Sequence, residues 1–413
     1  MIRKTLTIIM ICLLLLTTLA LPVSSESSSA KKNCIIPFFD KYAEILMKIG
    51  HIPSLSVGLI KNDELVFAKA YGYYDIENKK ETTLDTIYPI GSITKVITAT
   101  AMMQIVENES YNVKLDDDVN KYLPFKLRNP NFPDVNITIK NLLTHTSSIM
   151  DSGGVCHMLF GDPNITTYPD PYLRELLLPN GSLYMPKIWS DKKPPGEMQY
   201  YTYSPWGLIE MIIENLTGKN INDYCKEHIF YPLEMYDTSY RLYDLDIDRV
   251  ALEYEYLRGY YRRLVHYSWI PYGVGNVRST ISDLSHFLIA HMNGGVWNGV
   301  RILKESTVEQ MQTIQYPDFG TFGLSFQFDN LDNLKKDKII GHGGFPYNKM
   351  FYRPSDKTGV ILFENVVAFP SNAVDFRIGA DVSLMHLVNN YIAYITLTLI
   401  YNRLFLKGKF ILK

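Results

Sequence analysis

Residues 88–99 read YPIGSITKVITA, and this segment joins a turn signal to the start of an apolar helix. Pro89 and Gly91 favour a turn, and the residues after them favour a helix. Ser92 therefore lies at the predicted helix N-terminus, with Lys95 one turn later on the same face. There a hydroxyl faces unpaired backbone N–H groups and the positive end of the helix dipole. Because an amine within reach can share the hydroxyl proton, the pattern predicts an activated serine nucleophile.

The Ser-x-x-Lys spacing alone is weak evidence, because it occurs four times in the chain. The alternative interpretation of the Ser92 copy is an N-cap serine with a solvated lysine. Only this copy opens an apolar helix, which favours the catalytic interpretation once other features agree. The remaining copies are Ser28/Lys31 and Ser29/Lys32 in a polar N-terminal segment, and Ser190/Lys193 in a proline-rich loop.

The composition indicates a globular protein with a sizeable core. The 413 residues are 46% hydrophobic and 20% charged, enough for one large domain or two ordinary ones. The net charge of −2 gives no basic surface for nucleic acid, so we expect a small-molecule or peptide substrate. The sequence lacks Gly-x-Ser-x-Gly, His-Glu-x-x-His and Cys-x-x-Cys motifs, and His286 and His291 are spaced off a common helix face. We therefore expect neither a metal ion nor an organic cofactor.

Both ends of the chain are apolar. Arg3 and Lys4 precede an uncharged run at residues 6–21, which predicts a signal peptide or retained anchor over residues 1–25. We therefore expect an extracellular or cell-surface protein. The C-terminal tail, residues 391–413, is also apolar, but its clean run at 391–401 is shorter than the ~20 residues that span a bilayer. Either terminus is a candidate for membrane association.

The cysteines do not form a disulfide framework. Cys12 lies in the predicted signal, which leaves Cys34, Cys156 and Cys225. An odd number allows at most one bridge within the chain, and the sequence leaves the pairing open.

Strand signals at both ends of the chain bracket a helical middle, residues 116–298. The simplest fold that accounts for this pattern is α/β (α+β): one antiparallel sheet built from both chain ends and flanked by helices, with a mainly helical insertion. This predicts a linker at 26–34, a main domain at 35–390 and the apolar tail. The expected strands are 53–60, 64–73, 321–328, 338–341, 348–353 and 358–366, and the expected helices are 37–49, 92–107, 139–143, 205–214, 221–229, 281–292 and one from about 371.

Two further residues are candidates for the same site. Tyr201 could act as a base if neighbouring cations favoured its phenolate, since a tyrosine pKa is ordinarily near ~10. His342 lies between glycines after a strand signal, where backbone can approach a ligand and a backbone N–H could join that of Ser92 in an oxyanion hole. The alternatives are a packing tyrosine, one of thirty in the chain, and a turn histidine.

Taken in order, these features resemble the serine β-lactamase and penicillin-binding-protein superfamily, and within it the class C β-lactamase-like serine hydrolases. The resemblance covers residues 37–366, most of the chain outside the predicted signal. Each block is weak alone, but the full set in order is specific. The blocks are IGSITK at 90–95, LDDDV at 115–119, KYLP at 121–124, LLTHTS at 142–147, PLEMYDTS at 232–239, STISDL at 279–284 and a His-x-Gly motif at 342–344.

The resemblance implies roles for individual residues. Ser92 would be the acylated nucleophile and Lys95 its proton partner. Tyr201 matches the tyrosine of the Tyr-x-Asn motif, the base toward Ser92 and the acid toward the leaving group. His342 would line the site, in the position of the lysine in the Lys-Thr-Gly motif of many members.

The resemblance also implies an oxyanion hole and a structural histidine. The backbone N–H groups of Ser92 and Phe345 would form the hole, just after Gly344 of the His-x-Gly motif. His145, although it lies in a family block, would be structural.

Three positions depart from the family pattern. Tyr203 stands where the motif has Asn, so the amide that would hydrogen-bond substrate and Lys95 is missing. This substitution is compatible with acyl-enzyme chemistry but disfavours ordinary β-lactam turnover. Ser148 and Glu234 occupy positions where the family often has Gly, which affects local turns more than catalysis.

The sequence therefore predicts an exported serine hydrolase that cleaves an ester or amide bond through a covalent acyl-serine. Peptidase, esterase and β-lactamase-like activities are not ranked firmly, although the His-x-Gly motif favours the first two. The alternatives are a transpeptidase and a non-catalytic or slowly turning over penicillin-binding sensor.

Overall fold

The computed structural model describes residues 28–151, 158–160, 169–257, 259–329 and 338–367. The chain divides into two compact units, Met1–Leu46 and Met47–Lys413. The predicted signal at 1–25, the helix from about 371 and the apolar tail at 391–413 lie outside the described residues. None of the helices that the structure describes is long and apolar enough to cross a membrane.

Helix α2 (Ser28–Gly50) begins earlier than the sequence predicted. We expected a linker at 26–34 and a helix from residue 37, but the helix already covers residues 28–34. Ala30, Lys31 and Lys32 favour helix, and our prediction gave more weight to the polar character of this segment than to that propensity.

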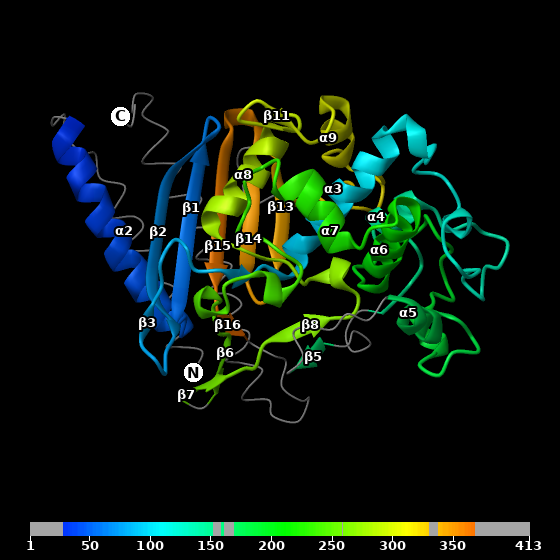
Figure 1. Ribbon diagram of the computed structural model, residues 1–413, viewed down its shortest axis with the longest axis horizontal. Helices are drawn as coiled ribbons and strands as arrows, with labels where there is room; N and C mark the ends of the chain where they lie inside the picture. Colours follow the sequence, from blue (N-terminus) through cyan, green and yellow to red (C-terminus); the bar gives the residue numbers. More distant parts are fainter. Residues whose placement is uncertain (1–27, 152–157, 161–168, 258, 330–337, 368–413) are drawn as a thin grey trace. The chain divides into compact units, whose positions relative to one another are not determined.

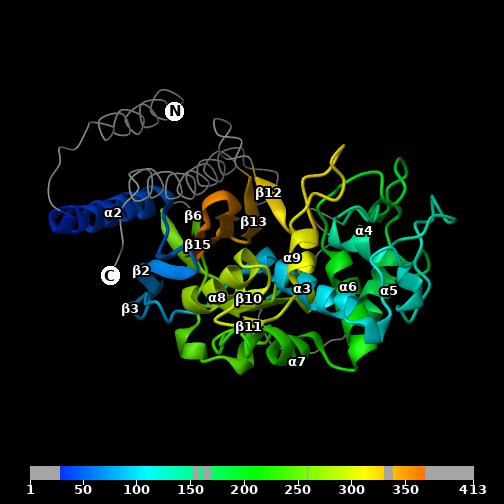
Figure 2. The ribbon, with the colours of Figure 1, turned by 90° about the horizontal axis from the view of Figure 1, so that it is seen from above.

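The second unit is built on a seven-stranded antiparallel sheet with the order β12-β13-β14-β15-β1-β2-β3 (Figure 1, with β12 labelled in Figure 2). Its centre joins the two ends of the chain, because β1 pairs with β15 in a register that sets Leu55 opposite Glu364. This confirms the predicted sheet from both chain ends. The strands are β1 (Ser54–Lys61), β2 (Glu64–Asp75), β3 (Lys80–Glu81), β12 (Gln327–Asp329), β13 (Ile339–Gly344), β14 (Asn348–Arg353) and β15 (Thr358–Glu364).

Strand β12 is shorter than expected. We predicted a strand over 321–328, but it covers only Gln327–Asp329. Ser325 has a φ of 72°, in the left-handed region that an extended strand cannot use. The apolar side chains Phe322, Leu324 and Phe326 are buried from an irregular segment instead.

The helices of the second unit form two groups. Helix α8 packs on β1, β2, β14 and β15, and it lies so close that a Cβ at Gly58 would be 2.7 Å from Ile281 Cγ2. Helix α6 contacts α3, α4 and α5, and Figures 1 and 2 show this group beside the sheet. The helices are α3 (Thr94–Glu107), α4 (Ile139–Leu143), α5 (Pro169–Leu177), α6 (Ser204–Thr217), α7 (Ile221–Cys225), α8 (Ile281–Met292) and α9 (Glu305–Met311).

The middle of the chain contains more strand than the predicted mainly helical insertion at 116–298. Short strands pair within this region and with the segments around it. They are β4 (Tyr88–Pro89) with β9 (Arg278–Ser279), β5 (Met158–Phe160) with β8 (Tyr267–Trp269), β10 (Val296–Trp297) with β11 (Val300–Arg301), and β6 (Tyr254–Leu257) between β7 (Tyr260–Arg263) and β16 (Val366–Val367).

Two of the departures from the family pattern fall on strained turns. Ser148 has a φ of 62° and Glu234 a φ of 53°, both in the left-handed region that favours glycine. Cys225 is a buried free thiol. A bridge that includes Cys225 is therefore excluded, whereas Cys156 lies outside the described residues.

Candidate active site

Ser92 lies in a tight turn at the start of α3. The short helical turn η1 (Gly91–Ile93) follows β4 and runs directly into the helix. Gly91 has a φ of 53°, and a Cβ there would lie 2.4 Å from both Phe345 N and Phe345 O. This φ favours glycine, and the close approach of the two backbone segments leaves no room for a side chain. The turn therefore presents Ser92 beside the backbone at the end of β13.

Lys95 is buried completely and contacts the Ser92 hydroxyl. Its Nζ donates to Ser92 Oγ at 2.9 Å and to the Val274 carbonyl oxygen at 2.7 Å. A lysine amine is costly to bury unless hydrogen bonds compensate for its lost hydration. The two bonds fix the amine against the hydroxyl, in the geometry that nucleophile activation requires.

The loop that carries Val274 is held by buried polar groups from two helices. Thr98 of α3 donates its hydroxyl to Gly273 O at 3.1 Å. Glu210 of α6 accepts from Gly273 N at 2.8 Å, and burial raises the pKa of this carboxyl well above its usual range. These groups fix the Val274 carbonyl that positions Lys95. Sequence analysis missed them because no motif marks a residue that acts through a backbone contact.

The end of β13 lies against the turn that carries Ser92. A Cβ at Gly344 would be 2.0 Å from Ile90 O, so this glycine is also required by close approach. Asn348, fully buried on β14, donates from Nδ2 to Pro89 O at 2.7 Å and ties the two segments together. The backbone of Phe345 therefore adjoins the turn that holds Ser92, as the predicted oxyanion hole requires.

His342 is a buried neutral imidazole beside Lys95. Its Nδ1 lies 2.5 Å from Gly343 O and must donate, since a carbonyl oxygen only accepts. Nε2 is therefore the unprotonated nitrogen, and it is buried with no hydrogen-bond partner among the described residues. Burial, and then the charge of Lys95, lower the pKa of His342 to about 3. The side chain offers an acceptor here, not a positive charge.

Tyr201 lies between His145 and Lys95. The Tyr201 ring centroid is 4.5 Å from that of His145 and 5.4 Å from Lys95 Nζ. His145 accepts from Thr202 N at Nδ1 (3.2 Å) and from Tyr200 N at its carbonyl oxygen (2.8 Å). Buried and held neutral by a pKa far below its usual value, His145 fixes the loop that carries Tyr201. These contacts agree with the structural role implied for His145.

Tyr203 also lies close to Lys95, and its ring centroid is 6.0 Å from that of Tyr201. Its ring centroid lies 5.2 Å from Lys95 Nζ, as close as that of Tyr201. Its backbone N–H donates to Asp151 Oδ1 at 2.9 Å, and Ser204 N donates to Asp151 Oδ2 at 2.5 Å. Asp151 is buried, and this burial raises its pKa. It anchors the first residues of α6, a role that sequence analysis missed.

The Ser190 copy of the Ser-x-x-Lys pattern has a different geometry. Its hydroxyl accepts from the backbone N–H groups of Lys192 (3.3 Å) and Lys193 (3.0 Å). The Lys193 side chain is half exposed and pairs with Glu197 at 3.5 Å. This serine closes a turn, whereas Ser92 contacts a buried lysine.

The structure thus brings the predicted site residues together around Lys95: Ser92, Tyr201, Tyr203, His342, Gly344 and Phe345. Lys95 Nζ is almost equally far from the rings of Tyr201 and Tyr203, so the assignment of Tyr201 as the acid/base residue stays a prediction.

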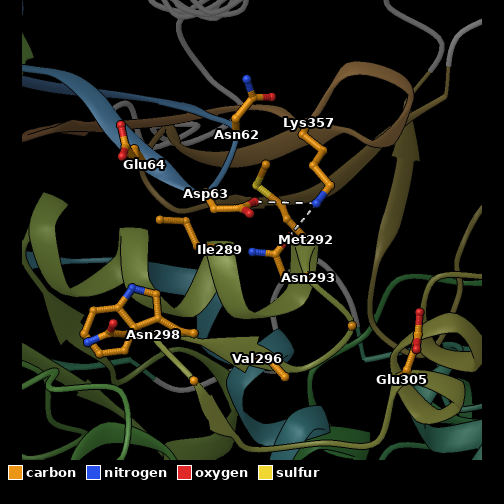
Figure 3. Close-up of a pocket in the computed structure, with 13 residues that line it drawn as sticks. Asn62, Asp63, Glu64, Ile289, Met292, Asn293, Val296, Asn298, Glu305 and Lys357 are labelled. Carbon is orange, nitrogen blue, oxygen red and sulfur yellow. Dashed lines mark hydrogen bonds and ion pairs between the residues drawn. The ribbon is translucent and has the colours of Figure 1, made fainter. Parts of the chain in front are cut away.

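A separate cavity of about 890 Å³ lies away from this site (Figure 3). It opens between the β1–β2 turn, the end of α8 and the β10–β11 hairpin. Lys357 reaches into it, 3.0 Å from Asn293 Oδ1 and 3.7 Å from Asp63 Oδ1. Among the described residues, its lining has no serine or cysteine that could form an acyl-enzyme ester or thioester. The lining residues are Asn62, Asp63, Glu64, Ile289, Met292, Asn293, Gly294, Val296, Trp297, Asn298, Gly299, Glu305 and Lys357.

The chain is similar to known bacterial proteins in sequence and to solved structures in fold. The chain is 27% identical over 331 residues to the PbpX protein of Bacillus subtilis (strain 168), covering 79% of this chain and 73% of PbpX. It is 30% identical over 220 residues to Protein flp of Staphylococcus aureus (strain N315), covering 52% of this chain and only 40% of that protein. The octameric penicillin-binding protein homologue from Pyrococcus abyssi superimposes with a TM-score of 0.67 at 26% identity, over 89% of this chain and 77% of that one.

The family match extends over most of the chain. A model of the family described as Beta-lactamase matches residues 39–383, from α2 past the last described strand. The matched range includes the turn that carries Ser92, the Tyr201 loop and β13. On this evidence the chain belongs to the beta-lactamase family.

Proposed function

We propose that the protein is a serine hydrolase that cleaves an ester or amide bond through an acyl-serine intermediate. The observation that carries this proposal is the fully buried Lys95, whose Nζ lies 2.9 Å from Ser92 Oγ. A lysine amine that is buried against a hydroxyl can take up the proton that the hydroxyl must lose. Membership of the beta-lactamase family supports the same chemistry.

The reaction proceeds in two steps. Ser92 Oγ attacks the substrate carbonyl carbon while its proton passes to the Lys95–Tyr201 pair. The N–H groups of Ser92 and Phe345 stabilise the oxyanion, and the proton is returned to the leaving alcohol or amine. Water then attacks the acyl-serine ester by the reverse route and regenerates Ser92.

Lys95 and Tyr201 share the proton-transfer role. Burial disfavours the charged form of Lys95, whereas a phenolate nearby would favour it. The two effects oppose each other, so we do not assign the resting proton to either residue. Both side chains are needed in either arrangement.

His342 bears on the substrate class. The side chain is neutral and offers an acceptor at Nε2, so this position supplies no charge for a substrate carboxylate. We therefore favour esterase or peptidase activity over a dedicated β-lactamase.

Tyr203 supports a second candidate, a penicillin-binding protein that turns over slowly. The Asn amide of the family motif would hydrogen-bond substrate and lysine, and here a ring 5.2 Å from Lys95 Nζ takes its place. If deacylation depended on that amide, the acyl-enzyme would persist. A transpeptidase would instead pass the acyl group to an amine.

A substrate panel separates these functions. The protein is incubated with a fluorescent penicillin, then with simple esters and D-amino-acid peptides. Covalent labelling together with turnover supports the hydrolase. Labelling that persists supports the sensor, and acyl transfer to an added amine supports the transpeptidase. If the protein shows neither labelling nor turnover, all three activities are contradicted and a non-catalytic binder remains.

We also propose that the protein is exported and acts outside the cytoplasm. Arg3, Lys4 and the apolar run at residues 6–21 support this proposal. Sequencing of the N-terminus from secreted and membrane fractions should find a start near residues 21–26 or an intact anchor. Full-length protein in the cytosolic fraction alone would contradict export.

A further inference from the structure

Tyr203 forms part of an aromatic surface in the site. Its ring lies parallel to the indole of Trp269, with 5.6 Å between centroids and 11° between planes. Trp269 is 8% exposed, whereas Tyr203 is only partly buried. The buried indole therefore packs against one face of the phenol ring, and the exposed part of this aromatic pair belongs to Tyr203.

Trp269 is fixed on the same loop that positions Lys95. Its backbone N–H donates to Asn276 Oδ1 at 2.6 Å, and its carbonyl oxygen accepts from Asn276 Nδ2 at 3.0 Å. The indole edge lies against Gly275, where a Cβ would be 3.1 Å from Trp269 Cδ1 and Nε1. Gly275 follows Val274, the acceptor for Lys95. The aromatic surface and the proton-transfer group thus share one support.

Phe345 continues this surface on the β13 side. Its ring is nearly perpendicular to those of Trp269 (6.5 Å, 85°) and Tyr267 (6.5 Å, 74°). Tyr267 is 3% exposed, whereas Phe345 is partly exposed. Two accessible rings, Tyr203 and Phe345, therefore stand in front of two buried ones. Tyr203 holds the sequence position of the Asn in the family motif, and Phe345 holds the position whose backbone N–H is the expected oxyanion donor.

This arrangement changes what the site can recognise. An asparagine amide would donate two hydrogen bonds and accept others, and it would select polar acyl substituents. A supported aromatic ring instead binds flat or apolar groups through buried area and stacking. We propose that Tyr203 and Phe345, backed by Trp269 and Tyr267, form a subsite for an aromatic or apolar group next to the scissile carbonyl. The proposal rests on the proposed serine-hydrolase function and names its substrate class.

The test compares two p-nitrophenyl esters that differ only in the acyl group, phenylacetate and acetate. Each kcat/KM is divided by the rate of hydroxide hydrolysis of the same ester, which removes intrinsic reactivity. We expect the phenylacetyl ester to be preferred by about tenfold or more, the scale of one well-packed ring in a pocket. A corrected ratio near one in the parent protein would overturn the subsite.

The variants identify the residue responsible. Tyr203→Asn and Tyr203→Leu should each reduce the corrected preference by about tenfold, and Tyr203→Phe should retain it. Two different replacements guard against a folding failure in one of them. Tyr200→Asn is the matched control, because Tyr200 lies on the same loop, is 36% exposed and should leave the ratio unchanged. Equal ratios in Tyr203→Asn, Tyr203→Leu and the parent would overturn the proposal.

A parallel measurement separates this proposal from the function on which it rests. Each variant is treated with a fluorophosphonate probe, and labelling of Ser92 is read by mass spectrometry. Labelling without an aromatic preference refutes the subsite alone. No labelling and no hydrolysis refute the hydrolase, and the subsite is then judged by phenylacetamide binding followed through tryptophan fluorescence. Binding that Tyr203→Leu weakens about tenfold supports it, and unchanged binding refutes it.

Discussion

Lys95 is fully buried, with its amine held by Ser92 Oγ and the Val274 carbonyl oxygen. Removing it takes away the group that accepts the serine proton. We expect Lys95→Ala to reduce kcat/KM by on the order of 10²-fold or more, the usual effect of losing a proton-transfer partner. The measurement is steady-state hydrolysis of the best ester in the panel.

The chain offers a matched control in Lys193, which has the same spacing from Ser190. Lys193 is half exposed and its ion pair with Glu197 is on the surface. Lys193→Ala should retain parental activity and stability within about 0.5 kcal/mol. Equal activity in the Lys95→Ala protein and the parent would refute the role assigned to Lys95.

Gly91 and Gly218 separate backbone strain from steric overlap. Both glycines have a positive φ, 53° and 69°, so substitution by alanine strains the backbone at either position. A Cβ at Gly218 meets nothing within 4 Å, whereas one at Gly91 would overlap the Phe345 backbone at 2.4 Å. Gly218→Ala should cost about 1 kcal/mol and label normally with a fluorophosphonate. In Gly91→Ala the Phe345 backbone must move, so we expect fluorophosphonate labelling to fall at least tenfold. Labelling at the parental level would show that the close approach of Gly91 to Phe345 is unimportant.

Among individual residues, those that belong to sequence motifs could be predicted. Ser92, Lys95 and His342 were predicted from local patterns and their order along the chain. Asp151, Asn348 and Glu210 were not, because each acts by accepting from or donating to a distant backbone group. No periodicity or spacing encodes such a contact before the fold is known.

Helix α8 shows when an element can be predicted accurately. It begins at Ile281 and ends at Met292, as expected, because Thr280 caps it by accepting from Asp283 N at 3.1 Å. The β6–β7 hairpin was missed because Gly259, which has a φ of 96°, is not part of an Asn-Gly or Asp-Gly pair, the usual signal of a two-residue turn. Helix α5 was missed because Pro169 and Pro171 argue against a helix, and its backbone is in fact kinked at Asp170.

Asp283 joins α8 to the segment before β6. Its Oδ2 accepts from Asp237 N and from the Thr238 hydroxyl, both at 2.8 Å, in a buried site. Asp283→Ala would leave these donors unpaired, and we expect the free energy of unfolding to fall by about 2 kcal/mol. Urea denaturation measures this change. Ser282→Ala, exposed on the same helical turn, should change it by less than about 0.5 kcal/mol, and similar losses in both variants would refute the proposed link.

The whole molecule depends on a sheet that joins residues about three hundred positions apart. Leu55 on β1 lies opposite Glu364 on β15, and β13 of the same sheet lies against the turn that carries Ser92. Strand content and its location at both ends were evident from the sequence. The strand order was not, since the hydrogen-bond partners of a strand depend on contacts that only the folded chain makes.

Buried histidines should make the whole fold sensitive to acid. Burial lowers the pKa of His291 to about 3, as it does for His342, whereas an unfolded histidine titrates near ~6.5. Because these folded pKa values lie below the unfolded one, the stabilisation is present above about pH 6.5 and is lost as pH falls toward 3. The loss approaches about 1.4 kcal/mol per pH unit for each histidine.

His291→Gln isolates this effect away from the active site. His291 packs between Phe287 and Phe326, and its Nε2 contacts Thr100 Oγ1 at 3.0 Å. Glu253 and Glu364, whose pKa values burial raises to about 8, shift stability in the opposite sense, so the variant is compared with the parent at each pH. The variant should lose less Tm than the parent between pH 7 and pH 4.5. An equal loss would show that His291 does not contribute.

The central claim is that Ser92 becomes acylated, and intact-mass analysis with a fluorophosphonate probe tests it most directly. The parent protein should gain one adduct, and peptide mapping should place it on Ser92. Ser92→Ala should remain unlabelled and lose ester hydrolysis while retaining the parental circular dichroism spectrum and Tm. An adduct on another residue, or full hydrolysis by Ser92→Ala, would contradict the assignment of Ser92 as the nucleophile.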